Sequence, residues 1–170
     1  VERATQPERI IVGCGDPAAP LPELYGRFLD SFGCPVLKMR YESAELTKIS
    51  INMCLIASIS IANTMAELCE AIGADWHEVV PALNLDRRIG PFAYLKPGLG
   101  IGGGNLERDL ATVQRLAGEH GTDSRVICAF HENSRHCRDW VLRAISNRFP
   151  NDRGARIAVW GLSYKADTHS

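Results

Sequence analysis

The sequence predicts a mainly helical protein that is flanked at both ends by pieces of α/β structure. A stretch without Pro or Gly runs from Ser43 to Ile72, with apolar residues at three- and four-residue steps. Later segments repeat this helical spacing, whereas short β-branched runs stand near both ends of the chain. We therefore expect a helical middle between the end of one α/β unit and the start of another, in a fragment of a longer protein.

The composition is that of a soluble globular protein. The 170 residues are 45% hydrophobic and 23% charged, and the net charge of −1 favours neither nucleic acid nor a membrane surface. No apolar run reaches the roughly 18 residues of a membrane span, because Ser and Asn interrupt Ile49–Ala62. The first residues lack the apolar core of a signal peptide. We predict a cytoplasmic protein without a nucleic-acid or membrane partner.

Six cysteines are spread along the chain without a C-x-x-C pair: Cys14, Cys34, Cys54, Cys69, Cys128 and Cys137. This spacing fits neither a zinc site nor the disulfide framework of a small secreted domain. Reduced and buried thiols are predicted, since free cysteine is commonly buried. No metal site is expected.

The first forty residues contain two predicted strands, Arg9–Gly13 and Pro35–Met39, with a short helix over Leu21–Phe32 between them. A G-x-G-x-x-A pattern, typical of dinucleotide-binding turns, begins at Gly13. Three prolines between residues 17 and 22 crowd the segment where the phosphate-binding helix should start. We therefore predict no nucleotide site at this pattern.

The long apolar segment predicts a helix of about 28 residues that begins with Ser43 as its N-cap and spans about 40 Å. That length suits either a spine that joins two parts or subunits, or a long core helix, and both interpretations remain open. Further elements are predicted in order: a helix over Trp76–Leu83 capped by Asp75, helices over Leu106–Glu119 and Ser124–Phe149, and a strand over Arg156–Gly161.

The most unusual stretch is Pro97–Asp109, which reads PGLGIGGGNLERD. Five glycines within seven residues indicate a backbone that turns tightly or is approached closely. A G-x-G-x-x-G pattern begins at Gly98, but no β-branched strand precedes it and no βαβ unit surrounds it. We favour a glycine-lined wall against which a substrate lies.

Two polar pairs with four-residue spacing accompany this stretch. Lys48 and Asn52 share one face of the long helix among apolar neighbours, and Asn105 and Asp109 share the start of the next helix. A lysine that extends its charge to solvent and an aspartate that complements a helix dipole would explain them structurally. The structural and the catalytic interpretations both remain open from spacing alone.

Four segments, in this order, resemble the UDP-glucose/GDP-mannose dehydrogenase family: AELTKISINMCLIASISIANTMAELCEAIGAD, DRRIG, LKPGLGIGGGNLERD and GLSYKADT. The resemblance implies a central domain over residues 43–150, a 6-phosphogluconate-dehydrogenase-like helical bundle with one long helix. Residues 1–42 would then be the C-terminal end of an NAD-binding Rossmann domain, and residues 151–170 the start of a nucleotide-sugar-binding domain. It also implies a homodimer through the helix Ser43–Ile72.

The resemblance further implies NAD-dependent oxidation of the CH–OH group of a UDP- or GDP-sugar, as in polysaccharide biosynthesis. Lys48 would stabilise an oxyanion, Asn52 would position water and substrate, and Asp109 would activate the water or hold Lys48. Arg88 matches an arginine that reaches the neighbouring subunit's substrate. The other implied substrate-binding residues are Tyr94, Leu95, Lys96, Gly102, Gly103, Tyr164 and Lys165. Residues that bind NAD are not assigned, because the fingerprint turn is missing.

The sequence departs from the family pattern G-F-G-G-S-C-x-P-K-D at the catalytic centre, where Asn105 replaces the nucleophilic cysteine. A thiolate can add to an aldehyde and become a thioester, whereas a neutral amide cannot. We therefore predict a reaction limited to two electrons or otherwise altered. The alternative is a non-catalytic dimerisation or binding relative, and a third possibility is a dehydrogenase of a small hydroxy acid built on the same plan.

Overall fold

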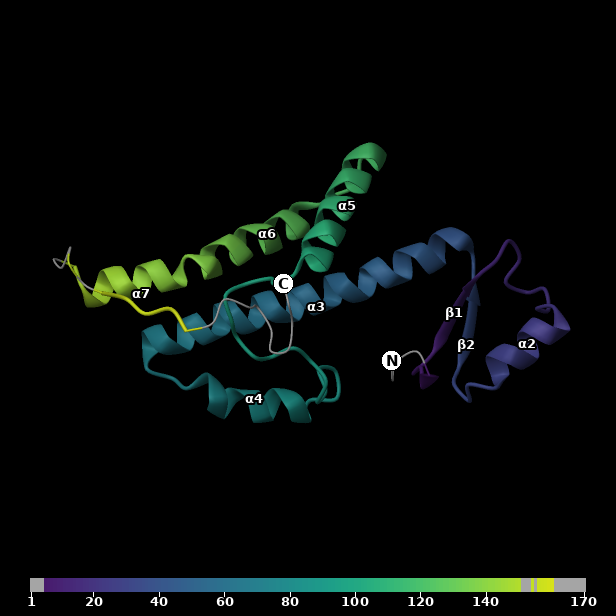
Figure 1. Ribbon diagram of the computed structural model, residues 1–170, viewed down its shortest axis with the longest axis horizontal. Helices are drawn as coiled ribbons and strands as arrows, with labels where there is room; N and C mark the ends of the chain where they lie inside the picture. Colours follow the sequence, from purple (N-terminus) through teal and green to yellow (C-terminus); the bar gives the residue numbers. More distant parts are fainter. Residues whose placement is uncertain (1–4, 151–153, 155, 161–170) are drawn as a thin grey trace. The chain divides into compact units, whose positions relative to one another are not determined.

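The computed structural model describes residues 5–150, 154 and 156–160, and the chain divides into two compact units between Ile51 and Asn52. The elements are β1 (Ile10–Gly13), α2 (Glu23–Asp30), β2 (Val36–Met39), α3 (Tyr41–Ile72), α4 (Trp76–Leu85), α5 (Gly104–His120), α6 (Arg125–Arg138) and α7 (Trp140–Arg148) (Figure 1). This order confirms the predicted fold class, a mainly helical chain with a small amount of parallel sheet.

The first unit contains a parallel strand pair in which Ile10 of β1 lies opposite Val36 of β2. Helix α2 connects the strands and begins only after Pro22, so the G-x-G-x-x-A pattern leads into a loop rather than a helix, as predicted. A Cβ atom at Gly13 would lie 3.2 Å from Cβ of Ala44, which shows that this glycine packs against the start of α3.

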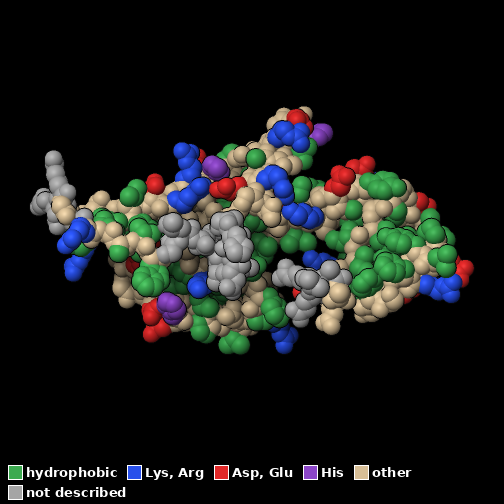
Figure 2. Space-filling view, viewed as in Figure 1, with side chains coloured by type: hydrophobic (Ala, Val, Ile, Leu, Met, Phe, Trp, Pro, Cys, Tyr) green, Lys and Arg blue, Asp and Glu red, His purple; other side chains and the backbone are tan. Residues whose placement is uncertain are grey.

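The surface of the first unit is rich in uncovered apolar side chains (Figure 2). Exposed members are Leu24, Tyr25 and Phe28 of α2 and Leu37 of β2. Parallel strands ordinarily lie in sheets that are covered on both faces, so this unit leaves apolar surface that a larger sheet would bury.

Helix α3 is the longest element, with 32 residues. It begins at Tyr41, so the prediction of Ser43 as its N-cap is wrong. The carbonyl of Arg40 accepts from the N–H of Ala44 at 2.9 Å, which means that β2 passes into the helix within one residue. The helix ends in a Schellman turn, in which Gly73 has φ of +78° and the Ala74 N–H donates to the Cys69 carbonyl at 2.9 Å.

Helix α3 is also more apolar than its interrupted runs suggested. An 18-residue window reaches a mean hydropathy of 1.5, so by length and composition alone the helix could cross a membrane. Its polar residues Asn52 and Asn63 nevertheless bond to other parts of the second unit. Such contacts are those of a helix packed inside protein.

The second unit has two hydrophobic cores, and α3 contributes to both. The first core joins α3, α4 and the segment after α4, through Ala62, Ala66, Cys69, Trp76 and Leu95. The second core joins α3, α5, α6 and the glycine stretch, through Ile56, Ile101, Leu110 and Ile127. Figure 1 shows α4 along one side of α3 and α6 along another.

The predicted single helix Ser124–Phe149 is wrong, because α6 and α7 are separated at Asp139. Nη1 of Arg143 donates to the carbonyl of His136 at 2.7 Å, the carbonyl that a continuous helix would pair with the Trp140 N–H. Helix α5 begins at Gly104, two residues before the predicted start. Asp75 caps α4 as predicted, its side chain accepting from the His77 N–H at 2.8 Å.

Two further expectations need correction. The part of the predicted strand Arg156–Gly161 that the structure describes, residues 156–160, has no regular structure. A strand needs a neighbour to pair with, and among the described residues β1 and β2 pair with each other. All six cysteines are free, but burial holds only for Cys69 and Cys137; Cys54 and Cys128 are exposed.

Candidate functional site

The structure joins two of the predicted catalytic residues, which lie 57 positions apart in the sequence. Nδ2 of Asn52 donates to Oδ2 of Asp109 at 2.6 Å. Asp109 is 5% exposed, so its carboxylate has left bulk water and depends on polar partners in the protein. This bond connects the middle of α3 to the second turn of α5.

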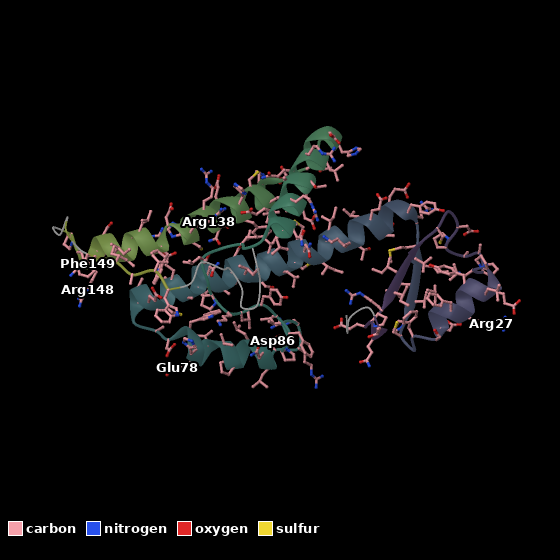
Figure 3. All side chains as sticks on the ribbon, viewed as in Figure 1. Arg27, Glu78, Asp86, Arg138, Arg148 and Phe149 are labelled. Carbon is pink, nitrogen blue, oxygen red and sulfur yellow. The ribbon has the colours of Figure 1, made fainter. Side chains whose placement is uncertain are left out.

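Ionic contacts hold the start of α5 in place. Nε of Arg108 lies 3.6 Å from Oδ1 of Asp109, and Nη2 of Arg138 lies 3.3 Å from Oε1 of Glu107. Arg138 stands at the end of α6 (Figure 3). The first turns of α5 are therefore tied both to α3 and to α6.

Lys48 lies one helical turn before Asn52 in α3, and its side chain is exposed. It belongs to the first unit, whereas Asn52 and Asp109 belong to the second. Lys48 has interactions of its own within the structure. The shared helix keeps Lys48 and Asn52 at the spacing that the sequence predicted.

Three side chains from three helices hold the backbone of residues 95–101, which runs into the glycine stretch, at three-residue intervals. Nε1 of Trp76 donates to the carbonyl of Leu95 at 2.8 Å. Oδ1 of Asn63 accepts from the Gly98 N–H at 2.7 Å, and Oγ of Ser134 accepts from the Ile101 N–H at 2.9 Å. Because Trp76 and Ser134 are buried, these bonds fix the path of the loop that leads into α5.

Gly100 explains one part of the glycine pattern. Its φ is +84°, and a Cβ atom there would lie 2.6 Å from the carbonyl oxygen of Ser134 and 2.7 Å from its Oγ. At this residue the close approach that glycine allows is made by α6, not by a ligand. At Gly98 and Gly104, by contrast, a Cβ atom would meet nothing within 4 Å.

Three predicted substrate-binding residues line one hollow of about 340 Å³. They are Tyr94, Leu95 and Lys96, and the rest of the wall consists of Ile59, Ala93, Gly98 and Gly100. The volume lies within the range of about 300–1,000 Å³ of small-molecule sites. Gly102 and Gly103 are not part of this wall; Gly103 has φ of +86° and is the N-cap of α5.

The side chain of Arg88 is exposed and forms hydrogen bonds with a neighbouring carboxylate. Its Nη2 donates to Oδ2 of Asp86 at 2.6 Å and its Nε donates to Oδ1 at 3.0 Å. These hydrogen bonds lower the pKa of the Asp86 carboxyl and raise the pKa of the Arg88 guanidinium. The side chain of Arg88 is 88% exposed, as an arginine that reaches another molecule would be.

Asn105 is the second residue of α5, one turn before Asp109, and it is exposed. Its amide can donate and accept hydrogen bonds but cannot form the covalent adduct that a thiolate forms. Tyr164 and Lys165, the remaining predicted substrate contacts, lie outside the described residues.

Sequence reasoning missed Trp76, Asn63 and Ser134, which hold the glycine stretch. Asn63 had a detectable signal, because it follows Asn52 by eleven residues and so occupies the same stripe of an apolar helix. Ser134 follows Ile127 by seven residues on the apolar face of α6, a weaker signal. Nothing in the sequence marked the indole of Trp76 as a donor to a backbone carbonyl 19 residues away.

Comparison with known proteins gives a consistent result. Residues 42–135 match the central domain of the UDP-glucose/GDP-mannose dehydrogenase family. These residues carry α3, α4, α5 and most of α6, together with the Asn52–Asp109 bond and the glycine stretch.

Individual relatives extend the similarity over nearly the whole chain. The chain is 32% identical to UDP-glucose 6-dehydrogenase TuaD of Bacillus subtilis over 95% of its own length and 34% of the relative's. It is 33% identical to UDP-glucose 6-dehydrogenase AglM of Haloferax volcanii, over 99% of this chain and 39% of that protein. The chain thus spans between a third and two fifths of the length of these relatives.

A solved structure, a UDP-glucose dehydrogenase from Pyrobaculum islandicum, superposes with a TM-score of 0.77 at 29% identity. The match covers 90% of this chain and 35% of that one. The helical arrangement around α3 is therefore shared with a known member of this group of proteins.

Proposed function

Because the chain belongs to the UDP-glucose/GDP-mannose dehydrogenase family, we propose that it forms the central part of an NAD-dependent oxidoreductase. The substrate class is a UDP- or GDP-sugar, oxidised at a CH–OH group in the cytoplasm. The observation that carries this proposal is the 2.6 Å bond between Asn52 and the buried Asp109, at the end of the glycine stretch.

In this proposal the flanking segments belong to neighbouring domains. Residues 1–42 end an NAD-binding domain, residues 43–150 form the central domain, and residues 151–170 begin a nucleotide-sugar-binding domain. The uncovered apolar surface of the first unit supports the first assignment, because a larger parallel sheet would bury it.

Each polar residue of the candidate site has a proposed role. The ammonium of Lys48 stabilises the negative charge that develops on the hydroxyl oxygen of the substrate as its proton leaves. The amide of Asn52 orients Asp109 through Nδ2, and its Oδ1 can accept from a substrate hydroxyl or a water. The carboxylate of Asp109 receives a proton from that water.

The substrate lies along the hollow lined by Tyr94, Leu95 and Lys96 in this proposal. Lys96 is exposed and supplies a positive charge suited to a diphosphate. Gly102 and Gly103 lead from that hollow to Asn105, while Arg88 extends into the substrate of a partner subunit. Tyr164 and Lys165 remain proposed contacts to the nucleotide sugar.

The described residues do not fit the role of a dinucleotide-binding turn. The loop after β1 leads to α2 only after Pro22, and Gly13 packs against α3. Because α2 begins at Glu23, beyond the last residue of the G-x-G-x-x-A pattern, the pattern does not open a helix whose N-terminus could receive a pyrophosphate. NAD is therefore proposed as the oxidant on the family's account, and its site is not assigned to the described part of this chain.

Asn105 sets the extent of the reaction. Oxidation of a hydroxymethyl group to an aldehyde removes two electrons and two hydrogens and needs no nucleophile. Further oxidation through a thioester needs a thiolate, which Asn105 does not supply. We expect the amide of Asn105 to hydrogen-bond the carbonyl or its hydrate without bonding to carbon.

A test of this function uses the complete protein with NAD⁺ and a panel of UDP- and GDP-sugars, with absorbance at 340 nm as the readout. At least one nucleotide sugar should give NADH, and Asp109→Asn should lower kcat at least about 100-fold. Arg115→Gln, which changes an exposed ion pair with Glu119 on the same helix, is the matched control. Absence of NADH with every sugar would contradict the proposal.

The second candidate, a non-catalytic binding relative, is supported by the sequence resemblance, which assigns the amide of Asn105 to the position of the family's cysteine. Lys48→Ala separates the two. In an enzyme it should abolish turnover while the protein stays folded, whereas a binding relative shows no turnover to lose and keeps its affinity for the nucleotide sugar.

We also propose that two copies associate through α3. Four apolar residues of this helix, Ile61, Met65, Leu68 and Ile72, are 39–69% exposed and recur at steps of four, three and four. Such a continuous apolar stripe is typical of a face that another helix covers.

A further inference from the structure

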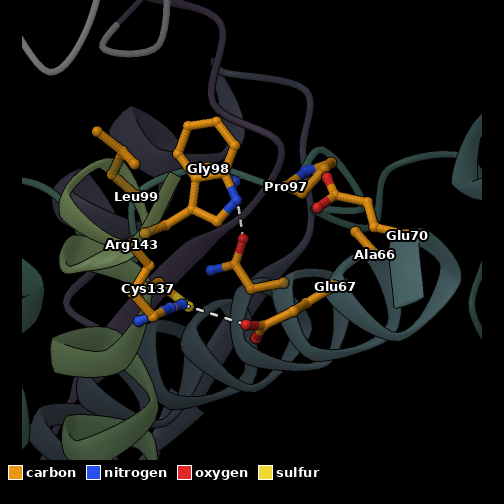
Figure 4. Close-up of a pocket in the computed structure, with 10 residues that line it drawn as sticks. Ala66, Glu67, Glu70, Pro97, Gly98, Leu99, Cys137 and Arg143 are labelled. Atoms are coloured by element: carbon orange, nitrogen blue, oxygen red, sulfur yellow. Dashed lines mark hydrogen bonds and ion pairs between the residues drawn. The ribbon is translucent and has the colours of Figure 1, made fainter. Parts of the chain in front are cut away.

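A second hollow is lined by the segment Pro97–Leu99, and its wall includes neither Tyr94 nor Lys96. Its volume is about 210 Å³, and its wall is formed by Asn63, Ala66, Glu67, Glu70, Pro97, Gly98, Leu99, Cys137, Trp140 and Arg143. Only Gly98 also lines the hollow assigned above to the nucleotide sugar. Figure 4 shows Glu67 and Glu70 on α3 across from Cys137 and Arg143 of α6 and α7.

The floor of this cavity contains a donor without a partner. Asn63 is 5% exposed, and its Oδ1 accepts from the Gly98 N–H at 2.7 Å. Its Nδ2 is buried and has no hydrogen-bond partner among the described residues. Buried amide nitrogens are nearly always paired, so this atom indicates an acceptor that the protein itself does not provide.

The charged groups at the rim differ in their availability. Nη2 of Arg143 lies 3.1 Å from Oε1 of Glu67, and Nε2 of His136 lies 2.8 Å from Oε2 of the same residue, so both oxygens of this carboxylate already have partners. Glu70 is exposed and can accept hydrogen bonds from an occupant. The wall thus has the two carboxylates of Glu67 and Glu70 and only the one guanidinium of Arg143, so like-charge repulsion disfavours a phosphorylated occupant.

The remaining wall is apolar. Trp140 is 44% exposed and Leu99 53% exposed, and Pro97 belongs to the same wall. Burial raises the pKa of the Cys137 thiol, so this wall presents a neutral S–H group rather than a thiolate nucleophile. The cavity is therefore suited to binding and not to covalent chemistry.

We propose that this cavity binds a neutral, polyhydroxylated ring of the size of one sugar unit. A hydroxyl group can accept a hydrogen bond from Nδ2 of Asn63, and a hydroxyl group can donate one to the carboxylate of Glu70. An apolar occupant can do neither, and an anion without hydroxyl groups cannot donate to Glu70. The C–H face of the ring packs on Trp140, and a volume below that of drug-sized sites limits the occupant to a single ring. This site is independent of the oxidation proposed above.

The test uses the 170-residue chain with Trp160→Phe, which removes a fully exposed indole outside the cavity. The probe is methyl α-D-glucopyranoside, followed by tryptophan fluorescence and by saturation-transfer NMR. We expect saturable binding with a Kd in the range of about 1–10 mM, as the small number of atoms allows. No saturable binding up to about 100 mM would overturn the proposal.

Variants at the rim test where the sugar binds. Trp140→Leu and Glu70→Gln should each raise Kd at least about threefold, whereas Glu132→Gln, an exposed acid of α6 outside the wall, should not change it. For Trp140→Leu the NMR signal replaces fluorescence. Asn63→Asp keeps an oxygen for Gly98 while removing the free donor, and should also weaken binding. Equal affinity of all variants would overturn the assignment.

The chemical class is tested with three other probes. Cyclohexanol lacks the additional hydroxyls and glucose 6-phosphate carries an anion, so both should bind at least about threefold more weakly; equal affinity would contradict the proposal. UDP-glucose should not displace the methyl glucoside, because Glu67 and Glu70 disfavour its diphosphate. Displacement would show that the cavity belongs to the nucleotide-sugar site. Maltose should bind through one terminal ring with similar affinity. Failure to bind would exclude the end of a glycan chain as the natural occupant of the cavity.

Discussion

Two faces of α3 have the same helical spacing and opposite surroundings. The inner stripe consists of Asn52, Ile56, Ile59 and Asn63, and the outer stripe of Ile61, Met65, Leu68 and Ile72. Both recur at steps of four, three and four. The inner stripe contacts α5, the second core, the hollow beside Tyr94 and the glycine stretch in turn. The outer stripe is exposed along its whole length.

The difference shows that one helix can have a face with defined hydrogen-bond partners and another face suited to apolar association. Polar residues at both ends of the inner stripe bond defined partners, so they fix how the glycine stretch and α5 lie against α3. The outer stripe contains no polar residue, so any complementary apolar surface can cover it. A helix with this much exposed apolar area is expected to acquire a partner.

The largest expected effect compares isoleucines from the two stripes. Ile56 is fully buried in the second core, so Ile56→Ala should lower the free energy of unfolding of the chain by about 2–5 kcal/mol. Ile61 is 59% exposed, and Ile61→Ala should change it by less than about 0.5 kcal/mol at concentrations where the chain is monomeric. Urea titration followed by circular dichroism measures both. Similar losses would mean that the two faces do not differ as described.

A second comparison concerns the loop that the inner stripe holds. Gly100→Ala forces a side chain into a backbone with φ of +84° and against Ser134, so it should lower the free energy of unfolding by about 1–3 kcal/mol. Gly98→Ala, two residues earlier, meets open space and serves as the control. Thermal unfolding is the measurement. An equal loss at both positions would contradict the proposed contact with α6.

The smallest effect on the folded monomer is expected from a charge on the outer stripe. Leu68→Glu should leave unfolding of the dilute chain within about 0.5 kcal/mol of the original, yet abolish association of the proposed dimer. Sedimentation velocity over a range of concentrations follows it. Leu24→Glu, an exposed leucine of α2, is the control and should leave association unchanged. Dissociation by both substitutions, or by neither, would be evidence against the outer stripe as the interface.

Local signals in the sequence were sufficient for most of the helices. The absence of Gly and Pro between Ser43 and Ile72 predicted α3, and Asp75 predicted the start of α4. The predicted helix boundaries were wrong where groups outside the local sequence pattern determine the start or end of a helix. The carbonyl of His136 is taken by the side chain of Arg143, which ends α6 where the periodicity continues. Ser43 is not a cap because β2 runs directly into α3.

The site was only partly predictable. Spacing placed Lys48 with Asn52 and Asn105 with Asp109, but it could not join α3 to α5; the family resemblance suggested that link, and the structure contains the bond between Asn52 and Asp109. The role of Gly100 depends on its contact with Ser134, and such tertiary approaches leave no periodic pattern in the sequence.

We propose that Asn105 occupies the position of the family's nucleophilic cysteine and limits the oxidation. The most direct measurement is the number of NADH molecules formed per sugar consumed by the complete protein, together with the product identified by mass spectrometry. We predict one NADH and an aldehyde or its hydrate for the natural sequence, and two NADH with a uronic acid for Asn105→Cys. Two NADH from the natural sequence would contradict the claim.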